Sequence, residues 1–158
     1  YAHGNQPIQH MIYLYNYSGQ PWKAQYRARQ VMDKLYNYLP DGYCGDEDNG
    51  QTSAWYVFSA LGFYPVTPGT DQYVFGSPLF NKVTLDFGKR NKLVIEAPEN
   101  SREKVYVKSI KLNGRRIDKN YITHRQLQEG GRLVFGMVAT PDSVRGTTPE
   151  AYPYSMSR

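Results

Sequence analysis

The sequence is poor in the residues that build metal or redox frameworks, since its 158 residues include a single cysteine, Cys44. One cysteine excludes an intrachain disulfide and any CxxC metal site, and it says little about the cellular compartment. No apolar run reaches the roughly 20 residues of a membrane span, and no signal peptide opens the chain. The sequence begins at Tyr1 without a methionine, so we expect a piece of a longer protein.

Several sequence motifs that indicate a particular function are also missing. The sequence has no G-x-G-x-x-G or P-loop fingerprint and no G-x-S-x-G elbow. An EF-hand counted from Asp46 fails, because Gly50 and Gln51 stand where that loop needs Asp or Asn and then Gly. A nucleotide-binding loop, a serine-nucleophile elbow and a self-contained calcium hand are therefore not expected.

The composition is that of a globular protein, with 40% hydrophobic and 15% aromatic residues. The formal charge of +5 raises the question of nucleic acid, but Lys and Arg are scattered along the chain. The densest basic cluster, residues 108–116, has the pattern of a strand and a turn rather than a binding motif. We therefore predict no nucleic-acid partner.

Residues 1–63 carry a helical period. Apolar side chains recur at i, i+3, i+4 and i+7 after Pro7, namely Ile8, Met11, Ile12 and Tyr15. Gly19 ends this predicted helix, and Pro21 begins a second one with the stripe Ala24, Ala28, Val31 and Leu35. The two segments predict a helical hairpin.

A third helix is predicted over residues 51–61, where Ala54, Val57, Phe58 and Leu61 form one stripe that Trp55 and Tyr56 widen. A helix this apolar around its circumference is typical of a buried position. About three helices are too few to enclose it, so we expect it to belong to a larger helical domain.

Residues 64–158 carry strand signals, with Pro and Gly every few residues and alternation over residues 82–87. Further strands are expected over 93–95, 105–112 and 133–137, and Asn113-Gly114 is the favoured pair for a tight hairpin turn. The sequence thus predicts an α+β fold with two parts, helices over 1–63 and an antiparallel β-sandwich over 64–158.

The acidic loop, defined as residues 45–51 (Gly-Asp-Glu-Asp-Asn-Gly-Gln), places three consecutive carboxylates between glycines just before a helix. Neighbouring like charges raise each other's pKa, so this crowding is costly unless a cation, a helix N-terminus or a catalytic role offsets it. The structural alternative is a solvated turn in which Asp48 or Asn49 caps the helix, because Asp and Asn are common N-cap residues.

Other residues could contact a ligand. His3 and His10 lie seven positions apart near the first helix, which is not the spacing of a zinc-binding pair. Trp22 and Trp55 could stack on sugar rings, although large aromatic side chains in helices usually belong to the core.

Three blocks, taken together, are much more specific. They are residues 3–7 (His-Gly-Asn-Gln-Pro), residues 13–23 (Tyr-Leu-Tyr-Asn-Tyr through Gly-Gln-Pro-Trp-Lys), and residues 41–65, which contain the acidic loop and Ser-Ala-Trp-Tyr-Val-Phe. Their order and separations resemble the end of the catalytic domain in glycoside hydrolase family 92, calcium-dependent inverting exo-α-mannosidases. Residues 73–80 and 112–114 resemble the strands that follow in that family.

The resemblance implies a β-sandwich and an (α/α)6 toroid of helical hairpins, and removal of terminal α-linked mannose, of α-1,2 type, with inversion. It implies that Asp48 is the general base, with Asp46 orienting or tuning it, and that the general acid lies upstream of this sequence. It further implies mannose-containing glycans as partners, with His3 and Trp22 as sugar-contacting candidates.

Relatives resemble His-Gly-Asn-Glu-Pro at the first block, whereas this sequence has Gln6. Calcium accepts amide oxygens as well as carboxylates, so Asn5 and Gln6 are candidate calcium ligands, and the alternative is that they cap the first helix. The resemblance also implies export to the periplasm or surface of a bacterium, and packing on a missing N-terminal part. The main alternative function is a non-catalytic carbohydrate-binding or accessory β-module.

Overall fold

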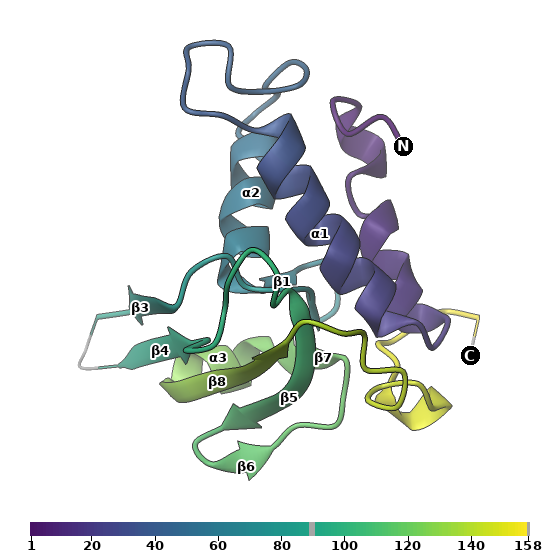
Figure 1. Cartoon of the computed structure of the whole chain (residues 1–158), viewed down its shortest axis with the longest axis vertical. Helices are drawn as coiled ribbons and strands as arrows, with labels where there is room; N and C mark the ends of the chain where they lie inside the picture. The colour runs from purple at the N-terminus through teal and green to yellow at the C-terminus, as the bar shows by residue number, and fades with distance from the viewer. Residues whose placement is uncertain (89–90, 158) are drawn as a thin grey trace.

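The computed structural model of the chain describes residues 1–88 and 91–157. It has an α+β architecture in which the N-terminal helices lie together at one end, and two sheets with a further short helix lie at the other (Figure 1). The helical end consists of two 3-10 helices, η1 (Gln6–Ile8) and η2 (Met11–Tyr17), and two α-helices, α1 (Pro21–Leu35) and α2 (Gln51–Leu61). The α+β class predicted from the sequence is confirmed.

The first predicted helix is wrong in its type and in its buried face. Residues 6–17 form two short 3-10 segments in place of one α-helix. Because a 3-10 helix has three residues per turn, the buried side chains are Ile12, Tyr13 and Asn16, whereas Met11 is 48% exposed. The buried polar group has a partner, since Asn16 Nδ2 donates to the backbone oxygens of Tyr13 and Phe75.

Helix α1 begins at Pro21, as predicted, and ends at Leu35, and it buries Ala24, Ala28 and Val31 of the predicted stripe. Two of its polar side chains reach the β part. Gln25 Oε1 accepts the backbone N–H of Val107 at 2.9 Å, and Arg29 donates to the backbone oxygen of Pro78 at 2.8 Å. The helix is therefore fastened to the sheets by polar bonds as well as by packing.

Helix α2 has the predicted bounds, but it turns a different face inward. The buried residues are Thr52, Trp55, Ser59, Ala60 and Leu61. Ala54 is exposed, and Val57 is 56% exposed, although both were expected in the buried stripe. The aromatic side of the helix packs against η2 and α1, which leaves the Ala54 and Val57 side uncovered.

The strands form two sheets. One is three-stranded and antiparallel, in the order β1 (Phe63–Tyr64), β2 (Gln72–Phe75), β7 (Tyr121–Thr123). The other is five-stranded, in the order β3 (Lys82–Asp86), β4 (Lys92–Glu96), β8 (Gly131–Val138), β5 (Tyr106–Leu112), β6 (Arg115–Arg116). The prediction of a purely antiparallel arrangement is wrong for β4 and β8, which pair in parallel. The long connection between them makes this crossover possible.

Local signals placed most strands correctly, and the Asn113-Gly114 turn is confirmed. Both turn residues have positive φ, 51° and 80°, as the favoured two-residue hairpin turn requires. Helix α3 (His124–Glu129) was not predicted, although Thr123 and Gln126 form the capping box that marks its start. A third 3-10 segment, η3 (Pro149–Ala151), follows near the C-terminus.

One hydrophobic core lies between the two sheets, and a second lies among the helices. Side chains of both sheets share the first core, and Leu61 at the end of α2 joins it. Val74 of β2 belongs to the second core, so the helical and β parts are in direct apolar contact. The division at residue 63 stays a prediction. Among the helices of the described residues, none combines the length and apolar character that a bilayer span needs.

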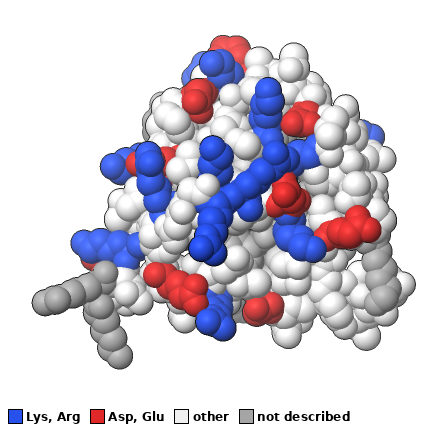
Figure 2. Space-filling view, turned by 90° about the horizontal axis from the view of Figure 1, so that it is seen from below, with Lys and Arg blue, Asp and Glu red and all other residues white. Residues whose placement is uncertain are grey.

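Charged side chains of both signs are mixed on the sheet end of the molecule. Figure 2 shows Lys and Arg interspersed with Asp and Glu over the face seen from below. Among the ion pairs of the five-stranded sheet, Glu96 contacts Lys82 at 3.8 Å and Arg132 at 2.5 Å.

Candidate functional site

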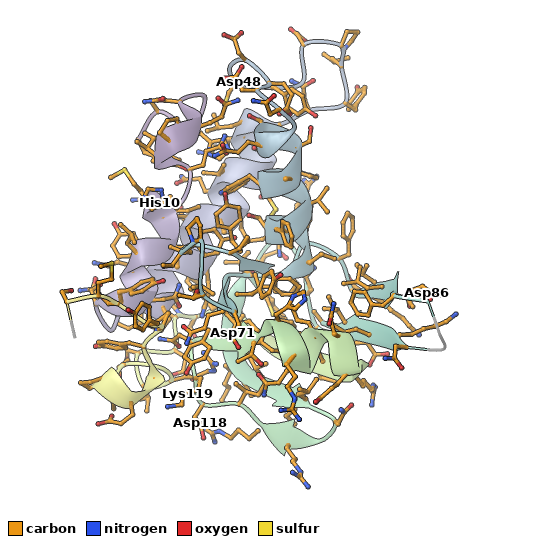
Figure 3. All side chains as sticks on the ribbon, turned by 180° about the vertical axis from the view of Figure 1, so that it is seen from behind. His10, Asp48, Asp71, Asp86, Asp118 and Lys119 are labelled. Carbon is orange, nitrogen blue, oxygen red and sulfur yellow. The ribbon has the colours of Figure 1, made fainter. Side chains whose placement is uncertain are left out.

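The acidic loop lies at the N-terminal end of α2, away from the sheets. Figure 3 shows Asp48 at the helical end of the molecule, whereas Asp71, Asp86 and Asp118 lie on the β part. The backbone of the loop turns into the helix through Asn49 and Gly50, both with positive φ. Three carboxylates are therefore concentrated beside the first N–H groups of a helix, several of which must find acceptors outside the helix itself.

The middle carboxylate of the loop binds the helix. Glu47 Oε1 accepts the backbone N–H of Thr52 at 3.0 Å, and its Oε2 accepts the N–H of Ser53 at 2.8 Å and the Ser53 hydroxyl at 2.6 Å. The expectation that Asp48 or Asn49 caps α2 is wrong, because Gly50 is the N-cap residue and makes no side-chain cap bond. Glu47 takes that role from three positions upstream of Gly50.

The two carboxylates on either side of Glu47 are exposed. Within residues 1–88 and 91–157, neither the Asp46 nor the Asp48 carboxylate receives a hydrogen bond or joins an ion pair. Their backbone atoms are nevertheless fixed, because Asp46 O accepts from Gln6 Nε2 at 3.0 Å and Asp48 O accepts the Gln51 N–H at 3.0 Å. The loop thus presents two unengaged carboxylates on an anchored backbone.

The first sequence block packs directly on the acidic loop. A Cβ placed on Gly45 would lie 2.7 Å from the Cα of Gly4, and a Cβ on Gly4 would lie 2.7 Å from the backbone oxygen of Cys44. Gln51 Nε2 also donates to the backbone oxygen of Gln6 at 3.0 Å. The structure therefore brings together two blocks that are 40 positions apart, as the Gln6–Asp46 bond shows.

We predict that Gly45→Ala destabilises the protein through steric conflict alone, because the φ of Gly45 is not positive. The added methyl meets backbone rather than a movable side-chain end, so the free energy of unfolding should fall by roughly 2–3 kcal/mol. Urea unfolding of the wild type and the variant measures the change.

The matched control for this substitution is Gly69→Ala. A Cβ placed on Gly69, whose φ is 88°, would meet no atom within 4 Å, so only backbone strain of about 1 kcal/mol is expected. Equal destabilisation by the two variants would contradict the close contact between Gly4 and Gly45.

His3, a predicted sugar contact, is only 2% exposed. Its Nδ1 is 2.7 Å from the Tyr1 hydroxyl and its Nε2 is 2.6 Å from the Tyr36 hydroxyl, and its ring packs edge-on against Trp55 with centroids 4.3 Å apart. Burial lowers the pKa of His3 to about 4, so the ring is neutral near pH 7. Its contact with sugar stays a prediction. In this structure both ring nitrogens are hydrogen-bonded to tyrosine hydroxyls.

Trp22, the other predicted sugar contact, lies at the opposite end of α1 from the acidic loop. Helix α1 has 15 residues and is therefore about 20 Å long, with Trp22 in its first turn and the acidic loop beyond its last. Trp22 lines a pocket with Tyr15, Tyr26 and Tyr106. The structure does not bring it to Asp48.

Three further side chains support the site in ways that the sequence did not predict. Thr52 is buried and its hydroxyl bonds Asp46 O and Gln6 Nε2, while Trp55 Nε1 donates to the backbone oxygen of Gln9 at 3.0 Å. Tyr36 donates to Thr52 O at 3.2 Å. The core position of Trp55 was among the alternatives offered by its sequence, and Glu47 had a signal too, since an acidic residue before a helix suits its N-terminus.

The predicted metal ligands have the right atoms but not a complete site. Asn5 is exposed and is the N-cap residue of η1, although its side chain makes no cap bond. Gln6 lies inside η1 and donates through Nε2 to Asp46 O and Thr52 Oγ1, so the capping alternative is wrong for Gln6. Because both bonds use Nε2, the Oε1 of Gln6 remains as a candidate ligand atom, and it is an oxygen of the type that calcium accepts. In the described part of the chain, no group of three or more His, Cys, Asp or Glu is placed to hold a metal ion.

Comparisons with known proteins point to one family. The profile described as the glycosyl hydrolase family 92 catalytic domain matches residues 1–139. A family GH92 inverting mannosidase from Bacteroides thetaiotaomicron shares 57% identity, with a TM-score of 0.94 over 100% of this chain and 21% of its own. A family GH92 α-mannosidase of the same organism shares 39% identity, with a TM-score of 0.93 over 98% of this chain and 21% of its own.

A curated protein from Arthroderma benhamiae, described as an uncharacterized secreted glycosidase, is 29% identical over 133 residues. That match covers 82% of this chain and 17% of the fungal protein. The chain thus spans about a fifth of the length of the relatives that it matches.

Proposed function

This chain belongs to glycosyl hydrolase family 92, and from that membership we propose that it is the base-carrying part of an inverting exo-α-mannosidase. The substrate is a glycan with terminal α-linked mannose, with the α-1,2 linkage as the first candidate. The observation that carries the proposal is the pair of unengaged carboxylates, Asp46 and Asp48, on a loop that four side-chain bonds fix to α2 and to the first block.

In the proposed mechanism Asp48 removes a proton from a water molecule as that water attacks the anomeric carbon. The glycosidic bond breaks on the opposite face, and a general acid protonates the leaving oxygen there. Inversion requires the acid and base carboxyl groups to stand about 6.5–9.5 Å apart, with room for the water between the sugar and the base. Asp46, two positions from Asp48, orients the water or adjusts the basicity of Asp48.

The general acid is proposed to come from outside this sequence. Glu47 lies between the two aspartates and both of its carboxylate oxygens accept bonds from α2. A side chain held in this way on the same loop cannot reach the other face of the sugar. The remaining part of the parent enzyme would therefore supply the acid.

Calcium is proposed as the metal that engages the sugar hydroxyls when bound. The amide oxygens of Asn5 and Gln6 would be its ligands from this chain, because both are hard donors and lie on the block that packs on the acidic loop. Further ligands would come from the rest of the parent protein, since the described residues form no cluster of three acidic or histidine side chains for a metal.

Two uncovered surfaces support a larger parent. One is an apolar pocket between η2 and α1, lined by Met11, Ile12, Tyr15, Val31 and Leu35 among others. The other lies beside the acidic loop and is lined by Tyr36, Tyr38, Tyr43, Tyr56 and Val57, of which Tyr38 is 96% exposed. We propose that the preceding part of the parent chain covers both, in an (α/α)6 toroid. Export to the periplasm or cell surface is proposed from the secreted relative.

An assay of the full-length parent enzyme tests the proposed function. We expect release of mannose from an aryl α-mannoside and from α-1,2-mannobiose, with no release from the matching α-galactoside. Proton NMR at early times should show β-mannose first, because one displacement inverts the anomeric centre. Removal of calcium by a chelator should abolish turnover. Appearance of α-mannose first, or sugar binding without turnover, would contradict the proposal, and the second result would favour the accessory module.

A further inference from the structure

Glu47 differs from its two neighbours in having partners for its carboxylate. Its oxygens accept the N–H groups of Thr52 and Ser53 and the hydroxyl of Ser53, at 2.6–3.0 Å. These N–H groups lie in the first turn of α2, where a helix offers no backbone acceptor. A single side chain thus closes the start of the helix and ties it to the middle of the acidic loop.

This bond completes a clamp around Asp48. Upstream of it, the loop is fixed by the contact of Gly45 with Gly4 and by the Gln6 bond to Asp46 O. Downstream, Asn49 and Gly50 turn the chain into α2, and Asp48 O accepts the Gln51 N–H. Asp48 has no side-chain bond of its own among the described residues, so its position depends on the backbone on either side of it.

We propose that Glu47 is a positioning residue, which holds Asp48 at the distance and angle needed to activate water by fixing the acidic loop to the start of α2. The inference rests on the proposed role of Asp48 as general base. It assigns the three consecutive carboxylates two different tasks, chemistry to the outer pair and alignment to the middle one.

The protonation state of Glu47 agrees with this task. The Ser53 hydroxyl, followed by the backbone N–H groups of Ser53 and Thr52, lowers the pKa of Glu47 below its usual value. The group therefore stays ionised near neutral pH and keeps all of its acceptor capacity. An ionised Glu47 has no proton to donate to a leaving group.

A double-mutant cycle in the full-length parent enzyme tests the inference, with 2,4-dinitrophenyl α-mannoside as an activated substrate so that weak variants remain measurable. Glu47→Ala should lower kcat about 10²-fold, the effect of a displacement on the order of 1 Å at a reacting group. KM should change less than about threefold. In an Asp48→Ala background, the same substitution should change kcat by less than about twofold, because no base remains to be positioned.

Two further variants separate alignment from charge and from folding. Glu47→Gln keeps one acceptor oxygen and should recover part of the lost kcat. Asp41→Ala removes an exposed carboxylate from the same connection without touching the start of α2, and it should leave kcat unchanged. Circular dichroism should show the helical content of every variant retained.

Equal loss of kcat on adding Glu47→Ala to the wild type and to Asp48→Ala would overturn the inference, since Glu47 would then act independently of Asp48. A wild-type kcat for Glu47→Ala would also overturn it. Retention of the wild-type rate by Asp48→Ala alone would remove the base assignment and the inference with it. That failure is recognisable because it does not involve Glu47.

Discussion

Replacing Asp48 by alanine in the parent enzyme is expected to lower kcat for α-mannoside hydrolysis by about 10³-fold, within the range that a positioned general base contributes. The fold should survive, because the Asp48 carboxylate is exposed and receives no hydrogen bond within the described residues. The backbone bond from Gln51 to Asp48 O does not depend on the side chain. Steady-state kinetics, with thermal unfolding of the same preparation, measures both quantities.

The matched control is Asp71→Ala, which removes the same carboxylate from the β part, far from the acidic loop in Figure 3. Its kcat should equal that of the wild type. A near-normal rate for Asp48→Ala would favour an accessory module, or a structural end of the enzyme in which the loop has no chemical role. A loss of helical content together with kcat would show that the loop acts on folding.

The second large effect concerns the 158-residue chain by itself, which we expect to hydrolyse neither an aryl α-mannoside nor a mannobiose. The reason is the geometry of inversion, which needs a second carboxyl group about 6.5–9.5 Å from the base on the other face of the sugar. Asp46 and Asp48 share one loop, and Glu47 is bound to α2. An overnight assay beside the full-length enzyme at equal molar concentration provides the comparison.

This expectation needs a folded sample, so two-dimensional NMR of the isolated chain is its control. Titration with mannose and with calcium in the same experiment would show whether residues 3–6 and 46–48 respond. Turnover by the isolated chain that resists purification and disappears on Asp48→Ala would contradict the prediction. It would place a complete acid and base pair within this sequence.

The sequence predicted correctly those elements whose ends are marked by proline, glycine or an Asn-Gly pair. Pro21 begins α1, Gly50 precedes α2, and Asn113-Gly114 sets the register of β5 and β6 through its positive φ values. The pattern of residues 6–17 predicted an α-helix because its apolar spacing suits one. Tertiary contacts decided otherwise, since the buried polar side chain of Asn16 is bonded across to Phe75.

Features that depend on distant partners could not be predicted from one sequence. The parallel pairing of β4 and β8 and the inward face of α2 are both set by segments that approach only in the fold. At the site, the family blocks pointed to Asp46 and Asp48 as the residues for chemistry, but they did not indicate that Glu47 binds the helix instead. These roles depend on which carboxylate faces the N–H groups of Thr52 and Ser53. The direction of a side chain in the loop cannot be told from its residue type.

The bonds that fasten α1 to the sheets also bear on the order of events during synthesis. Gln25 and Val107 are 82 positions apart, and Arg29 reaches Ser101 across 72. On the ribosome, α1 emerges well before its partners, and at about 5–20 residues per second it waits several seconds for them. During that interval the polar ends of Gln25 and Arg29 remain solvated. The contacts of the acidic loop, by contrast, all lie within residues 4–53, so the loop can align before β5 is synthesised.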